Sequence, residues 1–251
     1  MRMARAWIVS IDEPLFYGRL YKRLIEIEPA RIAGVVILPF SPSQSVRRLV
    51  REAWYRLRFW GWRGFLYSAL RALVSRAAGS GDIAGAARRA GLPVVHAAGI
   101  DAAVAALVAE RADIVLATVA SRVSAAALAA VPGGWVNTHC GALPRYAGMD
   151  APFWSLFYAE PELTVTLHYM NTEYDGGPII SQMQIPNDGR PYFRLVGDLF
   201  DCALLAHVDF LRKGWPALEE ARQQDPAVRR YFGKPPVDVG KEFRRRGGRF
   251  I

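Results

Sequence analysis

The sequence has 251 residues, of which 52% are hydrophobic and 22% charged. This balance excludes a disordered chain and is typical of one folded domain. Basic residues outnumber acidic ones by 32 to 23, and the net charge of +9 favours anionic ligands in general. Two cysteines are too few for a disulfide framework, and no apolar run reaches the ~18 residues of a membrane helix. We therefore expect a cytoplasmic protein without a membrane span.

Short apolar runs alternate with helical patterns along the chain. Strands are predicted at 6–11, 34–39, 92–97 and 113–119. Helical spacing of apolar residues predicts helices at 15–27, 83–90 and 102–110. The second half continues with a strand at 134–139, a helix from Pro152, strands at 163–170 and 178–185, and a helix at 192–213. This βαβ rhythm predicts the α/β class, with a Rossmann-like, mostly parallel sheet that carries helices on both faces.

Two segments fall outside this rhythm. Residues 43–77 contain eight arginines and one acid, Glu52, and their first part has helical spacing of Val46, Leu49, Val50, Ala53, Trp54 and Leu57. An insertion after the second strand lies toward the ligand-binding end of a parallel sheet. We expect its apolar face to cover a ligand cleft or a partner subunit and its arginines to meet an anion. A packed, solvated helix and a helix that docks on lipid are the alternatives. We divide the chain into a catalytic domain, 1–213, and a basic extension, 214–251.

Polar residues gather where the fifth predicted strand ends. Asn137 and His139 are two residues apart and so face the same side of that strand, and Asp175 follows in a glycine-flanked loop. An amide donor, an imidazole and a carboxylate together suit acyl transfer through a tetrahedral intermediate. The histidines and cysteines have no paired metal-ligand spacing, so we expect no metal.

With these residues stand three further motifs: Leu-Pro-x-x-x-Gly at 143–148, Val-Thr-x-His at 165–168 and Asp-x-Gly-x-Ile at 175–179. In this order the motifs resemble those of the folate-dependent formyltransferase family, over residues 91–186. The resemblance implies formyl transfer from 10-formyltetrahydrofolate to a primary amine of a small molecule. It implies that Asn137 donates to the formyl oxygen, that His139 stabilises this oxygen and relays a proton, and that Asp175 orients the histidine and accepts the amine proton.

The same resemblance suggests binding contacts on both sides of this trio. The folate side is assigned to Ser121, Arg122, Val123, Asn171, Thr172, Glu173 and Tyr174. The acceptor side is assigned to Arg145, Gly148 and Asp150, which follow the histidine. His168 is expected to be a buried supporting residue. One departure is Gly141, because the family often has a serine at that position.

Several alternatives stay open at this point. Water could replace the amine, which would make the protein a formyltetrahydrofolate hydrolase, or the fold could bind folate without turnover. We expect transfer, because no regulatory domain fits before Ala6. The segment after Lys213 is shorter than the C-terminal barrel of the methionyl-tRNA enzymes, on the order of 100 residues, so we expect no nucleic-acid partner. A homodimer is an open alternative.

Overall fold

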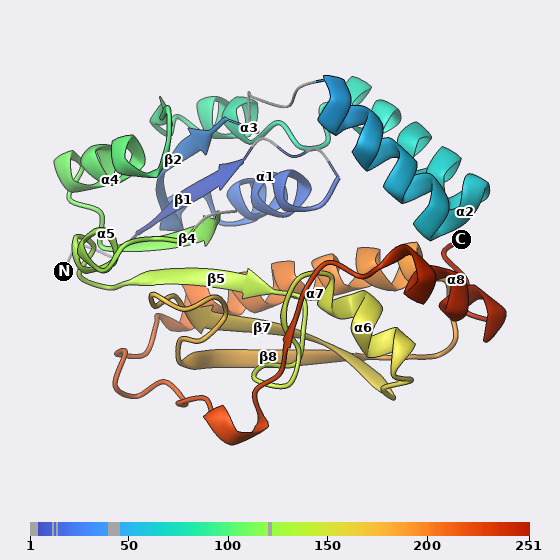
Figure 1. Ribbon diagram of the computed structural model, residues 1–251. Helices are drawn as coiled ribbons and strands as arrows, with labels where there is room; N and C mark the ends of the chain where they lie inside the picture. The colour runs from blue at the N-terminus through green and yellow to red at the C-terminus, as the bar shows by residue number, and fades with distance from the viewer. Residues whose placement is uncertain (1–4, 12, 14, 40–45, 120–121) are drawn as a thin grey trace.

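A twisted central sheet organises the protein (Figure 1). The computed structural model describes residues 5–11, 13, 15–39, 46–119 and 122–251. Within them, seven strands pair in the order β3-β2-β1-β4-β5-β7-β8. Their bounds are β1 Ala6–Ile11, β2 Ile32–Leu38, β3 Val94–His96, β4 Ile114–Thr118, β5 Trp135–His139, β7 Glu162–Tyr169 and β8 Ile179–Pro186. The first five strands are parallel, whereas β7 is antiparallel to both of its neighbours.

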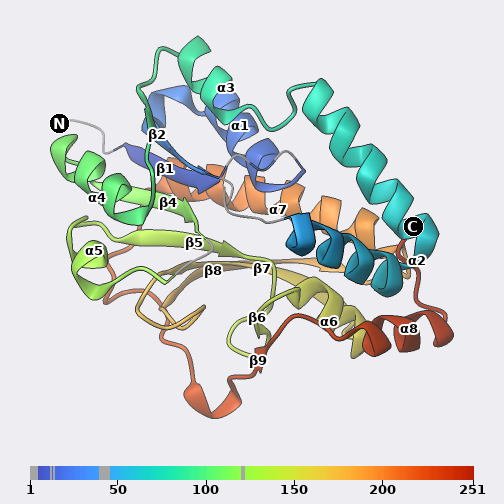
Figure 2. The same cartoon turned by 45° about the horizontal axis from the view of Figure 1, so that its top comes forward.

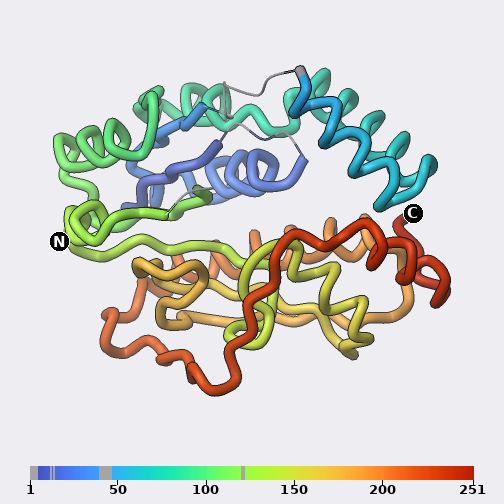
Figure 3. The backbone as a smooth tube through the Cα atoms, in the orientation of Figure 1, coloured from blue at the N-terminus to red at the C-terminus, as the bar shows by residue number. Residues whose placement is uncertain are grey.

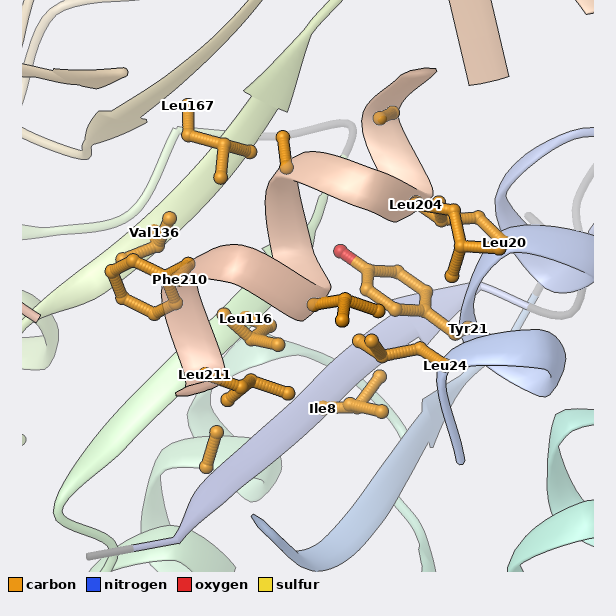
Figure 4. Close-up of a cluster of buried hydrophobic side chains, with 14 of the residues drawn as sticks. Ile8, Leu20, Tyr21, Leu24, Leu116, Val136, Leu167, Leu204, Phe210 and Leu211 are labelled. Atoms are coloured by element: carbon orange, nitrogen blue, oxygen red, sulfur yellow. The ribbon is translucent and has the colours of Figure 1, made fainter. Parts of the chain in front are cut away.

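Helices cover both faces of this sheet. One face carries α1 Tyr17–Ile27, α3 Ile83–Arg89 and α7 Tyr192–Lys213, and the other carries α4 Ile100–Ala109 and α5 Ala125–Ala129. In α1, Leu20 and Leu24 recur at i, i+4 and pack on Ile8 of β1 (Figure 4). The central strands β1 and β4 are buried on both faces, which explains their almost uninterrupted apolar sequences. The predicted α/β class with a mostly parallel sheet is confirmed.

The predicted elements differ from the observed ones mainly at their ends. The helix expected at 192–213 matches α7, whereas β2 begins at Ile32, two residues before the expected start. The helix expected from Pro152 is the short helix α6, Ala151–Phe157. The five-residue helix α5 was not predicted. Shorter elements complete the chain: η1 Pro29–Arg31, η2 Pro226–Val228, β6 Ala147–Gly148, β9 Tyr231–Phe232 and α8 Val237–Arg245.

The insertion forms α2, Val46–Ala77, a hairpin of two helical arms that splay apart from a shared bend (Figure 2). Its arms, 46–60 and 62–77, meet at Gly61, whose φ of 77° and ψ of 169° break the helix. Only glycine adopts such a φ without strain. We call this unit the α2 hairpin.

The predicted apolar face of the α2 hairpin does not cover a ligand cleft, and its contact with a partner subunit stays a prediction. The apolar residues that set the predicted face, Leu49, Val50 and Trp54, are 52–62% exposed. The domain instead receives Phe59, which is 3% exposed and lies 4.8 Å, ring to ring, from Phe153 of α6. The ring contacts of Phe59 with α6 therefore bury one face of the first arm, and Trp54 stays on its exposed face.

The C-terminal segment runs back across the domain (Figure 3). Strand β9 pairs with β6, and α8 then packs against the α2 hairpin. The chain ends with Phe250 in the same aromatic cluster as Phe59 and Phe153. This return path brings residues beyond 213 next to the loop that follows β5.

Candidate active site

The three predicted catalytic residues lie together where β5 ends. Asn137 and His139 point to one side of β5, and Asp175 reaches them from the loop before β8. His139 Nδ1 lies 3.5 Å from Asp175 Oδ1. Asn137 Nδ2 lies 3.1 Å from His168 Nε2, which is itself 3.7 Å from Asp175 Oδ1. The structure therefore joins the predicted trio through a fourth residue, His168.

His168 fixes the orientation of the Asn137 amide. It stands directly opposite Asn137 in the β5–β7 pairing and is 2% exposed. Burial lowers the pKa of His168 to about 4, although the Asp175 charge acts in the opposite direction, so the ring is neutral at pH 7. Its Nδ1–H donates to the Tyr169 carbonyl at 2.8 Å, which leaves Nε2 to accept from the Asn137 amide. The second N–H of that amide then points away from His168.

The imidazole of His139 is held from the opposite side. Its Nε2 lies 2.6 Å from the Tyr146 carbonyl oxygen. Because a carbonyl only accepts, this nitrogen carries a proton, and Nδ1 is the nitrogen turned to Asp175. The ring is 7% exposed, so substrate access is confined to its edge.

Gly141 makes room for this imidazole. A Cβ at position 141 would lie 2.6 Å from His139 Nε2 and 2.6 Å from the Ala151 side chain. Any side chain here would push the ring from the Tyr146 carbonyl. The departure from serine that the sequence displays thus follows from a close packing of the His139 ring.

The Asp175 loop is locked by backbone and tail contacts. Asp175 has a φ of 52°, a left-handed conformation rare outside glycine. The Gly148 N–H donates to Asp175 Oδ2 at 2.8 Å. The Gln224 side-chain amide donates to the carbonyls of Asp175 at 2.8 Å and Gly177 at 2.6 Å. Gln224 belongs to no motif and comes from the C-terminal segment, so the sequence offered no signal for it.

A groove runs from this cluster on the side predicted for folate. Its inner part, about 60 Å³, is lined by Asn137, His168 and Asp175 together with Arg122, Val123, Asn171, Glu173 and Tyr174. Its outer part, about 420 Å³, is lined by Arg122, Glu173, Tyr174, Arg229 and Tyr231. The Arg122 guanidinium lies over the Tyr174 ring, 4.9 Å from its centroid. Thr172 is exposed and lines neither part, and Ser121 falls outside the described residues.

Two cavities lie on the other side of His139. The first, about 210 Å³, is lined by His139, Cys140, Gly148 and Asp150 among others. The second, about 230 Å³, lies under the α2 hairpin and shares Phe16, Asp150 and Tyr192 with the first. Asp150 stands at the junction, where surrounding protein raises its pKa while Lys234 and Arg56 lower it.

Arg145 does not line the acceptor cavities as predicted, and Cys140, which follows His139, is not a reactive thiol. Arg145 lines neither cavity; it is exposed and lies 3.7 Å from Glu160, with which it forms an ion pair. The reason is the chain direction after β5, which turns residue 145 outward before β6 begins. Cys140 lines the first cavity, but burial raises the pKa of its thiol to about 12, so it stays protonated.

In the part of the chain that the structure describes, no group of three or more histidine, cysteine, aspartate or glutamate side chains could hold a metal ion. None of the helices described is long and apolar enough to cross a membrane.

Comparisons with known proteins bear on this site. The sequence model of the formyl transferase family matches residues 94–188, which include the trio. A methionyl-tRNA formyltransferase from Roseiflexus sp. (strain RS-1) is 33% identical over 182 residues, covering 71% of this chain and 47% of that relative. The chain thus spans about half the length of the curated relative it matches.

Solved structures share the fold. A phosphoribosylglycinamide formyltransferase from Anaplasma phagocytophilum has a TM-score of 0.58 at 13% identity, covering 92% of this chain and 100% of that one. A sugar 3N-formyl transferase, solved in the presence of dTDP and 5-N-formyl-THF, has a TM-score of 0.51 at 13% identity, covering 92% of this chain and 70% of that one. Identities this low establish the fold alone.

The fold and the polar cluster define an α/β protein with a candidate catalytic site at the carboxyl ends of its strands. The matches in sequence and fold go further, and the chain belongs to the formyl transferase family.

Proposed function

We propose that this protein transfers a formyl group from 10-formyltetrahydrofolate to the primary amine of a small molecule. The observation that carries the proposal is the position of the cluster of Asn137, His139, His168 and Asp175, which lies between two separate spaces. A transfer reaction needs a donor and an acceptor that approach one reacting carbon from different sides. The groove lined by Arg122 would hold the donor, and the two cavities that share Asp150 would hold the acceptor.

In the proposed reaction, the amine nitrogen attacks the formyl carbon and the carbonyl electron pair moves onto oxygen. The free N–H of Asn137 donates to this oxygen, because its other N–H is held by His168. Asp175 takes the proton that the amine loses, directly or through water, and shares it with Nδ1 of His139. The intermediate then collapses and the carbonyl re-forms. The folate nitrogen leaves with the proton that Asp175 had taken from the amine. The 3.5 Å between His139 and Asp175 is a distance that closes when substrate binds.

The folate groove has features that suit the donor. Its inner part contacts the trio directly, and its outer part contains two arginines, Arg122 and Arg229. Arg229 Nε is buried and has no hydrogen-bond partner among the described residues. Arg229 Nη2 donates to the Tyr174 carbonyl at 2.6 Å, and Nη1 lies 3.9 Å from the exposed Glu173 carboxylate. A carboxylate of the glutamate tail of folate would take the place of that weak ion pair. We assign Arg229, which the sequence did not indicate, to that tail.

The acceptor cavities suit a small organic amine. Each volume, about 210 and 230 Å³, is below the range of about 300–1,000 Å³ that is usual for small-molecule sites, and the two cavities joined at Asp150 reach that range together. Asp150 at their junction supplies a carboxylate for an ammonium group before the amine loses its proton. Because one relative is named for methionyl-tRNA, the absence of a nucleic-acid acceptor stays a prediction.

The test supplies 10-formyltetrahydrofolate with a panel of amino sugars and other small primary amines, and separately with initiator methionyl-tRNA. We expect a formylated small amine, detected by mass spectrometry, in amounts equal to the tetrahydrofolate released. Formylated tRNA would overturn the acceptor assignment, and tetrahydrofolate release without any amine would identify a hydrolase. The variant Asp150→Asn should raise KM for the amine about tenfold and leave folate affinity unchanged. Asp188→Asn, an exposed change far from both cavities, is the matched control.

A further inference from the structure

The α2 hairpin carries an apolar surface that the protein does not cover. Large apolar side chains follow the outer face of each arm, with exposed fractions of 52–69%. This surface, which we call the apolar stripe, consists of Leu49, Val50 and Trp54 on the first arm and Trp62, Leu66, Leu70, Leu73 and Val74 on the second. Single exposed leucines are common, but Leu66, Leu70, Leu73 and Val74 recur at i, i+4, i+7 and i+8 on one face of the second arm, and an exposed apolar face of this kind marks an interaction site.

The stripe faces away from the domain on both arms. On the first arm, Phe59 packs against Phe153 and Phe250. On the second, Tyr67 lies 5.4 Å, ring to ring, from Phe193 at the start of α7.

On the second arm, the residues that face the domain also include Ser68, Ala69 and Ala72, which line the second acceptor cavity. Leu66, Leu70 and Leu73 lie on the helix face opposite these three residues, as Val50 and Trp54 lie opposite Phe59 on the first arm. The two arms meet at Gly61 and splay apart from it, as Figure 2 shows, so each arm presents its own exposed apolar face.

The charges around the stripe are of one sign. Arg47, Arg51, Arg58, Arg63 and Arg76 are all exposed, and none forms an ion pair within the described residues. The only acid between residues 46 and 77 is Glu52, which turns toward the domain and lies 2.7 Å from Lys234 Nζ. No negative group of α2 therefore neutralises its outer face.

This charge distribution selects the occupant. A second copy of the hairpin would bring two arginine-rich faces together, and like charges at an interface weaken association. A nucleic acid would pair with the arginines but would leave the leucines without a contact. An anionic lipid surface satisfies both, because phosphate headgroups pair with the arginines and acyl chains receive the stripe.

We propose that the α2 hairpin docks the protein on an anionic lipid surface, with both arms in the plane of the headgroups. Trp54 and Trp62 suit this position, because an indole ring has an apolar body and a polar N–H. The inner faces of the same arms line the second acceptor cavity, through Trp60 and Phe65. Docking therefore places that cavity beside the lipid. The proposal does not depend on the chemistry of the site.

The first experiment is co-sedimentation of the full chain with vesicles of equal parts phosphatidylglycerol and phosphatidylcholine. Leu66, Leu70 and Leu73, all changed to Glu, should reduce the vesicle-bound partition coefficient at least tenfold. The matched control changes Val108, Leu205 and Leu218 to Glu; these are 50–59% exposed on other elements and should leave binding unchanged. Equal losses in both variants would overturn the proposal, as would the absence of binding by the unaltered protein.

The second experiment tests the arginines of the α2 hairpin and does not depend on the folding of the glutamate variant. Arg47, Arg51 and Arg63 changed to Gln should lower binding to the same vesicles at least fivefold and weaken its salt dependence. Arg88, Arg111 and Lys213 changed to Gln form the charge-matched control. Equal binding of the unaltered protein to pure phosphatidylcholine would contradict the role of charge. Light scattering on the same proteins would overturn the lipid assignment if the stripe substitutions dissociate a dimer.

Discussion

The His139 cluster and the outer face of the α2 hairpin differ in how their side chains find partners. In the cluster, β5, β7, the loop before β8 and Gln224 of the C-terminal segment supply groups that meet within 2.6–3.7 Å. On the hairpin, one continuous segment presents apolar side chains that are 52–69% exposed, with arginines such as Arg47, Arg51 and Arg63 that form no ion pair within the described residues. The first region is completed by the fold itself, whereas the second needs a surface outside it. Substitutions in the cluster should therefore lower turnover or stability, whereas substitutions on the outer face of the hairpin should change both only slightly.

The largest effect is expected in turnover after substitutions in the cluster. Asn137→Ala should lower kcat by about 10²–10³, because one oxyanion donor is lost. His139→Ala and Asp175→Asn should each lower it by about 10² or more. Steady-state kinetics with 10-formyltetrahydrofolate measure kcat, and fluorescence titration should show that folate still binds. A variant that keeps nearly all of its turnover would remove that residue from the mechanism.

Acid should destabilise the folded domain through its buried histidines. His207, buried in α7, donates from Nδ1 to the Ala203 carbonyl at 2.8 Å, and burial lowers its pKa to about 4. In the unfolded chain the pKa is near 6.5. Between these values the unfolded chain binds a proton that the folded protein does not, so the free energy of unfolding falls as pH falls.

The expected loss from His207 is about 2–3 kcal/mol between pH 7 and 4.5. His168, with a pKa of about 4, adds a change of the same sign. Urea denaturation at pH 7, 5.5 and 4.5 measures how steeply the free energy of unfolding falls with pH. The variant His207→Gln should reduce this slope. An identical slope in the variant would mean that other groups control the acid response.

A smaller effect is expected from one added side chain beside the cluster. Gly141→Ser places a Cβ 2.6 Å from His139 Nε2 and should cost about 1–3 kcal/mol of unfolding free energy, with a fall in kcat. Thermal and urea denaturation give the stability. Gly99→Ser is the control, because nothing lies within 4 Å of its added Cβ and serine is a favourable residue at the helix N-cap that Gly99 occupies. Equal costs at both positions would contradict the packing argument.

The smallest effect on the free energy of unfolding is expected from substitutions on the exposed face of the α2 hairpin. Leu66→Ser should change the free energy of unfolding by less than about 0.5 kcal/mol, because Leu66 is 59% exposed. Urea denaturation at two protein concentrations measures it. A loss above about 1 kcal/mol that grows with concentration would show that a second copy already covers the stripe.

The sequence predicted much of this protein because local patterns carry the information. The helical spacing in 192–213 and the apolar runs of the strands depend only on backbone periodicity and burial, so these elements appear where they were expected. The Asn-x-His step places Asn137 and His139 on one side of β5, because side chains alternate along a strand. The family motifs then led to Asp175, which no spacing rule alone would have chosen.

Tertiary packing decided the rest. Gln224 holds the Asp175 loop, and Arg229 lines the outer folate groove, because the C-terminal segment returns past β6. Arg145 turned outward to Glu160 for a similar reason of chain direction. The α2 sequence has apolar residues on both helix faces, so periodicity could not say which face would be buried. The contact of Phe59 with Phe153 and Phe250 settled that choice, because these three rings come from segments far apart in the sequence and meet only in the folded protein.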